Sequence, residues 1–256
     1  MPKVNRIRQT KIAVISTFHR DVLKDFFMLK LILKYKEDGI MKGAIFDMDG
    51  LMFDTESVFV KAWDYVGDRL GIGPAGFMVI ETLGMNLEVT KQKWRERFGG
   101  KCDEAEVERM TYEYIDDYYA NNHVPVKKGL KTILDYLKGH RYRIAVASSS
   151  PENVVKAHLK DADIDKYFDV IMCGDMVAKS KPEPDIYIEA ATKLKLPTSE
   201  CYAFEDSESG LKAALASGCR TIMVPDLWQP DDVMRQKVAA VCKDLDEAAV
   251  YIDSDK

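Results

Sequence analysis

The chain has 256 residues, 46% of them hydrophobic and 31% charged, a balance typical of soluble globular proteins. The formal net charge of −5 gives no support for nucleic-acid binding as the main activity, because such proteins are strongly basic. The five cysteines, an odd number without C-x-x-C spacing, argue against a disulfide framework or a zinc site and fit a reducing cytoplasm.

Residues 1–40 differ in composition from the rest of the chain, with nine lysines and arginines against four acidic residues. Their most apolar stretch, residues 26–35, is interrupted by Lys30 and is too short to span a bilayer. An amphipathic helix on a membrane surface is one interpretation of this segment. We favour another, in which the native chain begins at Met41 and residues 1–40 lie outside the native fold, because a strand pattern starts directly after Met41. We therefore expect no membrane partner.

Short apolar runs rich in β-branched residues recur along the chain and predict strands. They alternate with helical patterns, and such alternation predicts a Rossmann-like α/β core, a parallel sheet with helices on both faces. The strands are expected at residues 43–47, 143–148, 168–173, 201–205 and 220–224, and the helices at residues 129–139, 151–161, 183–194 and 208–217.

Residues 55–125 break this alternation with a long helical pattern that is rich in aromatic residues. The segment is too long for a loop, so we expect a helical cap domain inserted into a catalytic core made of residues 41–54 and 126–256. Gly71 and Gly73 mark a turn between its helices. We interpret the acidic and aromatic stretch 112–119 as a half-solvated helix rather than a binding site.

Polar side chains stand where three of the expected strands end. Because the carboxyl ends of parallel strands meet at one edge of a sheet, these groups are expected to converge. Carboxylates suit Mg²⁺, whereas hydroxyl and ammonium groups suit a phosphate. The pattern therefore predicts a divalent metal and a phosphoryl group. The residues are Asp47 and Asp49 after the first strand, Ser148 and Ser149 at the second, Glu205 and Asp206 at the fourth, and Lys181 just before a helix.

Four segments resemble the motifs of the haloacid dehalogenase (HAD) superfamily, most of all its beta-phosphoglucomutase-like phosphatase group. They are FDMDG at 46–50, ASSS at 147–150, KSKPEPDIY at 179–187 and FEDSESG at 204–210. The expected helical insertion stands where that group carries its cap. The resemblance implies a HAD-like fold and a Mg²⁺-dependent phosphatase that acts on a small phosphomonoester, such as a sugar phosphate.

The resemblance also implies roles for the residues of these motifs. Asp47 would be the nucleophile that forms an aspartyl-phosphate, and Asp49 the general acid and base. Mg²⁺ would be held by Asp47, the backbone carbonyl of Asp49, Asp206, and Glu205 directly or through water. The phosphoryl group would be bound by Ser148, Ser149 and Lys181.

For some polar residues and glycines near these motifs, a local structural role is an alternative to a role in binding or catalysis. Ser150 is expected to cap the helix that follows it. Asp54 could cap the first helix of the insertion, and Glu56 could face the substrate. Gly50 and Gly210 are interpreted as glycines of turns or close approaches rather than ligands.

A phosphosugar mutase of the same group is the main alternative activity. The true mutases carry a histidine and an arginine in the cap where this sequence has Phe59 and Leu87, and neither of these can bind a second phosphate. Hydrolysis is therefore favoured. A receiver-type phosphoacceptor domain is a third interpretation, but the Asp47-x-Asp49 spacing and the insertion argue against it. The sequence does not reveal the oligomeric state, and a monomer is the default assumption.

Overall fold

The structure is a computed structural model that describes residues 42–255 except residues 84, 86 and 102. The expectation that residues 1–40 lie outside the native fold falls outside these described residues. Within the described part of the chain, no helix combines the length and the apolar character needed to cross a membrane.

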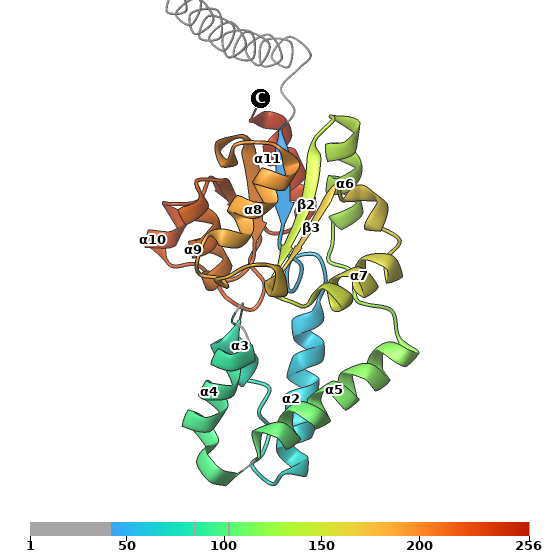
Figure 1. Cartoon of the computed structure of the whole chain (residues 1–256), viewed down its shortest axis with the longest axis vertical. Coiled ribbons are helices and arrows are strands. Elements are labelled where there is room, and N and C mark those ends of the chain that lie inside the picture. Colours follow the sequence, from blue (N-terminus) through green and yellow to red (C-terminus); the bar gives the residue numbers. More distant parts are fainter. Residues whose placement is uncertain (1–41, 84, 86, 102, 256) are drawn as a thin grey trace, which may run out of the picture. The chain divides into compact units, whose positions relative to one another are not determined.

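Six parallel strands form one sheet in the described part of the chain, in the order β3-β2-β1-β4-β5-β6 (Figure 1). All five expected strands are confirmed to within two residues at their ends. The sixth was not expected, because two residues are too few to show a periodic pattern. The strands are β1 Gly43–Phe46, β2 Arg143–Ser148, β3 Val170–Cys173, β4 Cys201–Glu205, β5 Arg220–Met223 and β6 Ala240–Val241.

Helices cover both faces of the sheet, which explains why the strands are apolar throughout. On one face, Phe46 of β1 stacks on Phe204 of β4 with ring centroids 4.4 Å apart. Ile45 points to the other face and packs in a separate apolar cluster. The first face is covered by α6 Leu130–Gly139, α7 Glu152–Asp161 and α11 Leu245–Ser254, and the second by α8 Asp185–Leu194 and α9 Glu208–Ser217.

The four helices expected in the core are confirmed, whereas α10 Asp232–Arg235 and α11 were not expected. Cys173, Cys201 and Cys219 are buried. Short 3-10 helices complete the described chain: η1 Gly99–Lys101, η2 Asp165–Tyr167, η3 Gly174–Met176 and η4 Thr198–Glu200.

The insertion is helical, and its described residues form no strand (Figure 1). Its helices enclose an apolar cluster of their own, which includes Trp63, Met78 and Trp94. Gly71 and Gly73 have φ angles of 71° and 79°, the left-handed conformation that the turn requires. The helices are α2 Thr55–Arg69, α3 Met78–Thr82, α4 Leu87–Phe98 and α5 Glu104–Asn121.

Two linkers connect these helices to the rest of the chain and lie side by side. Phe53 and Val126 form an antiparallel bridge. The N–H of Asp54 donates to the carbonyl oxygen of Pro125 at 2.8 Å. The chain therefore enters and leaves the insertion at one place, close to the end of β1.

Candidate active site

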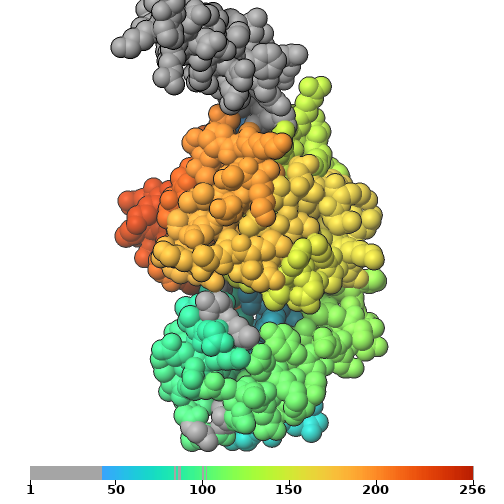
Figure 2. Space-filling model, in the orientation of Figure 1, coloured from blue at the N-terminus to red at the C-terminus, as the bar shows by residue number. Residues whose placement is uncertain are grey.

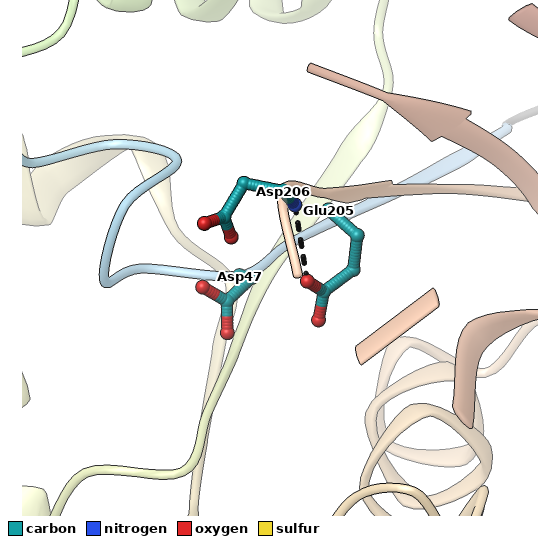
Figure 3. Close-up of side chains that lie close together, drawn as sticks. All are labelled: Asp47, Glu205 and Asp206. Carbon is teal, nitrogen blue, oxygen red and sulfur yellow. Dashed lines mark hydrogen bonds between the residues drawn. The ribbon is translucent and has the colours of Figure 1, made fainter. Parts of the chain in front are cut away.

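Three buried carboxylates meet at the ends of the neighbouring strands β1 and β4 (Figure 3). Asp47 directly follows β1, and its N–H donates to the Phe204 carbonyl at 3.1 Å, which continues the strand pairing. Glu205 ends β4 and Asp206 follows it. One oxygen of each carboxylate lies within 4.8 Å of the others. The parallel sheet thus brings together residues that are far apart in the sequence.

The carboxylates of this group repel one another. Burial raises the pKa of Asp47 well above its ordinary value, although the charge of Lys181 opposes the shift. Burial, followed by the charges of Asp47 and Glu205, does the same to the pKa of Asp206. Ionised carboxylates in such a place need a cation to compensate them.

Asp206 has room and an unused oxygen for that cation. Its Oδ1 is buried and has no hydrogen-bond partner among the described residues. Gly50, with φ of +83°, leaves space beside it, since a Cβ there would lie 2.2 Å from Asp206 Oδ2. A set of carboxylate oxygens with one buried oxygen unpaired fits a divalent cation that prefers oxygen ligands.

Lys181 joins two of the carboxylates. Its Nζ donates to Asp47 Oδ1 and, at 2.6 Å, to Glu205 Oε1. Burial lowers the pKa of Lys181, but the two carboxylates raise it by more, so the net pKa lies above the ordinary value. Lys181 is therefore a cation at neutral pH.

Glu205 already has donors on both of its oxygens. Oε1 also accepts a hydrogen bond from the Tyr187 hydroxyl at 2.6 Å. Oε2 accepts from the Asp206 N–H at 3.1 Å and from the Ser207 hydroxyl at 3.2 Å. Gly210 makes this possible, because a Cβ there would lie 1.8 Å from Oε1. Glu205 is thus held firmly in place beside the other two carboxylates.

Asp49 has a different environment, made of hydroxyl groups. Its Oδ1 accepts from Thr55 Oγ1 at 2.9 Å. Its Oδ2 accepts from Ser150 Oγ at 2.8 Å and from Ser148 Oγ at 3.3 Å. These bonds hold the side chain of Asp49 toward α2 and the end of β2.

The structure corrects two expectations about helix caps. Pro151 occupies the N-cap position of α7 and no side chain caps that helix, because the hydroxyl of Ser150 is turned to Asp49 instead. Asp54 does occupy the N-cap position of α2, but its carboxylate makes no capping hydrogen bond and lies 3.6 Å from Lys127 Nζ.

Thr55 and Ser150 are contacts of Asp49 that the sequence motifs did not single out. Thr55 is six residues from Asp49, and Ser150 is 101 residues away. The "SSS" run was visible in the sequence, but nothing local indicated which of its hydroxyls would reach Asp49.

A cavity of about 400 Å³ lies over Asp47 and Asp49, bounded by the strand ends and by the helices of the insertion. Figure 2 shows the outer surface where the helices of the insertion meet the rest of the chain. Ser149 and Ser150 line the cavity, whereas Ser148 is fully buried behind them. The helices contribute Glu56, Phe59, Trp63, Lys91, Trp94, Arg95, Glu104, Glu108, Thr111 and Tyr112.

Two residues on the helical side of the cavity, Glu56 and Tyr112, can be compared with what the sequence predicted for them. Glu56 lines the cavity, and burial, followed by the charges of Asp49 and Asp47, raises its pKa to about 8. A carboxyl with this pKa is mostly protonated at pH 7 and can donate a hydrogen bond. Tyr112 begins the stretch that we expected to be only a half-solvated helix; its side chain is exposed, as expected, yet it also lines the cavity.

Comparisons with known proteins identify the family. Residues 44–224 match the family described as haloacid dehalogenase-like hydrolase. The phosphorylated carbohydrates phosphatase of Thermotoga maritima is 30% identical over 191 residues, which cover 71% of this chain and 84% of that protein. The beta-phosphoglucomutase of Bacillus subtilis is 31% identical over 185 residues, covering 70% and 80%.

A solved structure has the same fold. CbbY from Rhodobacter sphaeroides, in complex with phosphate, superposes with a TM-score of 0.68 at 24% identity, covering 81% of this chain and 96% of that one. The family match over residues 44–224 spans more than two thirds of the chain. The chain belongs to the haloacid dehalogenase-like hydrolases.

Proposed function

We propose that this protein is a Mg²⁺-dependent phosphatase that hydrolyses a small phosphomonoester through an aspartyl-phosphate. The observation that carries the proposal is that two carboxylates beside one cavity have different partners. Asp47 is paired with the cation Lys181, whereas Asp49 is held by hydroxyl groups. Carboxylates in such different environments can divide the roles of nucleophile and acid–base. The likeness to a carbohydrate phosphatase supports this activity.

In the first half of the reaction, a carboxylate oxygen of Asp47 attacks phosphorus. The bond from phosphorus to the ester oxygen breaks, and Asp49 gives its proton to that oxygen, so the alcohol leaves neutral. In the second half, Asp49 takes a proton from water. The resulting hydroxide attacks phosphorus, the bond to Asp47 breaks and inorganic phosphate is released.

The side chains of Asp47 and Asp206 and the backbone carbonyl of Asp49 are proposed to hold Mg²⁺. Bound there, Mg²⁺ would offset negative charge on the phosphoryl oxygens and on the carboxylates. Glu205 has donors on both oxygens, which favours an indirect role through water or through the positions of Lys181 and Asp206.

The phosphoryl group needs donors that are already in place. Ser149 lines the cavity, and Ser148 supports the turn behind it by accepting the Ser150 N–H at 3.0 Å. Lys181 supplies positive charge beside Asp47. We propose that these groups orient the phosphoryl oxygens, and that helices α2 to α5 act as a cap that excludes water while the ester is cleaved.

A mutase is the second candidate, because the chain is also similar to a beta-phosphoglucomutase. Such an enzyme must hold a second phosphate in the cap. Phe59, at the position where we expect the mutase histidine, lines the cavity with an apolar ring. The side chain of Leu87, the other position, lies outside the described residues. Incubation with a sugar 1-phosphate distinguishes the activities, because a mutase forms the 6-phosphate without releasing inorganic phosphate.

The test is a phosphate-release assay with Mg²⁺ over a panel of sugar, polyol and nucleoside monophosphates and p-nitrophenyl phosphate. We expect release from some of these esters, and a loss of about a thousandfold or more in Asp47→Asn. Asp163→Asn is a matched control at an exposed site, and its activity should equal that of wild type. No release by wild type over the whole panel would overturn the proposal. A cytoplasmic location stays an expectation from the cysteine content, and a monomeric state stays the default assumption.

A further inference from the structure

The helical wall of the cavity carries two cationic side chains among the described residues, Lys91 and Arg95, both on α4. Each is paired with a carboxylate of α5. Lys91 Nζ lies 2.8 Å from Glu108 Oε2, and Arg95 Nε lies 2.9 Å from Glu104 Oε1. All four side chains line the cavity, so the charge of each cation is already offset where a ligand would meet it.

Carboxylates match the two cations on this wall, so neither cation of the described wall is left unpaired for a ligand. Glu56 adds a carboxyl that is mostly neutral at pH 7, and Asp47 and Asp49 lie at the base of the cavity. A second phosphate or a carboxylate on the substrate would therefore meet carboxylates. It could gain a cation only by displacing Glu108 or Glu104, which costs the free energy of the pair and adds like-charge repulsion.

The rest of the wall suits an uncharged partner. Phe59 is half-buried and presents an aromatic ring to the cavity, whereas Trp63 and Trp94 line it from the buried apolar cluster of the insertion and are only 7% and 3% exposed. Aromatic faces pack well against the C–H groups of sugars and polyols. Tyr112 adds a hydroxyl group that can pair with a substrate hydroxyl, whereas the hydroxyl of Thr111 already donates to the Val107 carbonyl oxygen at 2.7 Å.

We infer that the cavity selects a monophosphate ester whose alcohol part is uncharged and bears several hydroxyls, such as a sugar or a polyol, and that the Lys91–Glu108 and Arg95–Glu104 pairs exclude a second anionic group. The inference rests on the proposed function, because it describes the leaving group of that reaction. A volume of about 400 Å³ is at the small end of ligand pockets, which suits a leaving group of sugar size.

Two substrates that differ in a single charge test this selection. Glucitol 6-phosphate ends in a hydroxymethyl group, whereas gluconate 6-phosphate has a carboxylate at the same carbon. We expect wild type to show a kcat/KM for glucitol 6-phosphate at least about tenfold above that for gluconate 6-phosphate. We add p-nitrophenyl phosphate as a third substrate, because it has no second anionic group and therefore reports on ester hydrolysis alone.

A variant then shows whether the ion pair causes the preference. Glu108→Gln releases Lys91 from its charged partner and should raise kcat/KM for gluconate 6-phosphate, so that the ratio falls by about fivefold or more. Glu113→Gln is the matched control, because Glu113 also lies on α5 and pairs with Arg109 at 2.8 Å, but neither residue lines the cavity. The control should keep the wild-type ratio.

The remaining outcomes overturn either the inference alone or the proposed function together with it. Equal or better hydrolysis of gluconate 6-phosphate by wild type overturns the inference, as does an unchanged ratio in a Glu108→Gln protein that melts at the wild-type temperature. Hydrolysis of p-nitrophenyl phosphate in these cases leaves the proposed function standing. No release from any of the three esters would instead overturn the proposed function, and the inference with it.

Discussion

Thr55 Oγ1, on the first residue of α2, donates a hydrogen bond of 2.9 Å to Asp49 Oδ1. Thr55 is 1% exposed, so water does not compete for this bond. The contact joins the helical insertion to the carboxylate that we propose as acid and base. The position of α2 and the orientation of Asp49 are therefore coupled.

Replacement of Thr55 tests this coupling. Thr55→Val removes the donor but keeps the shape, and we expect kcat to fall by about tenfold with little change in KM, because Asp49 is less well oriented for proton transfer. Thr55→Ser keeps the hydroxyl and should retain most of the activity. Steady-state kinetics on one ester provide the measurement, and equal kcat values for Thr55→Val and wild type would contradict the role.

Lys181 should be essential for stability as well as for activity. Lys181→Met leaves Asp47 and Glu205 buried without their cation, and the free energy of unfolding should fall by about 3 kcal/mol. Urea denaturation at pH 7 without added metal measures the change. Lys212→Met is the control, because Lys212 pairs with Glu208 on the exposed surface of α9 and its loss should cost less than about 1 kcal/mol. Equal effects of the two variants would show that Lys181 does not compensate these carboxylates.

Metal binding should be visible in stability independently of activity. Mg²⁺ at about a hundred times its Kd should stabilise the folded state by about 2.7 kcal/mol and raise the melting temperature by several degrees. Chelation with EDTA should abolish phosphate release, and added Mg²⁺ should restore it. Asp206→Asn should lose the thermal shift, whereas Asp163→Asn should keep it. A full thermal shift in Asp206→Asn would remove Asp206 from the metal site.

His158 on α7 should make stability depend on pH. Its ring lies edge-on to Phe53 at 5.7 Å and to Tyr119 at 5.1 Å between centroids, beside one linker and helix α5. Burial lowers its pKa below the ordinary 6.5, although Asp49 and Asp161 oppose the shift. The unfolded chain then binds the proton more readily than the folded one. The stability from the neutral ring is therefore complete above about pH 6.5 and is lost as the pH falls through that value toward the folded pKa.

His158→Phe keeps an aromatic ring and removes the titration. Between about pH 7 and pH 5, we expect the free energy of unfolding to fall more steeply for wild type than for this variant. Urea denaturation at several pH values, followed by circular dichroism, gives the slopes. His140→Phe, at an exposed histidine, should keep the wild-type slope. Parallel curves for wild type and His158→Phe would exclude the effect.

The core of the fold could be predicted from local patterns. Strands covered on both faces are apolar at every position, as in the run Ala44-Ile45-Phe46, so they stand out from the helices between them. Helix α11 also had a signal that was missed, since Asp244 caps it by accepting the Glu247 N–H at 3.0 Å and Leu245 begins its buried face. Strand β6, with two residues, had none.

The sequence by itself determined which residues end the strands, and therefore which chemical groups can meet at the edge of a parallel sheet. Asp47, Asp206 and Lys181 follow from the motifs and their spacing. Only the tertiary structure decided which donor each carboxylate receives. The hydroxyl of Ser150 donates to Asp49 rather than capping the helix that follows it. Lys91 of α4 pairs with Glu108 of α5. Such bonds depend on the placement of whole elements to within an ångström or two, and local sequence patterns carry no record of that placement.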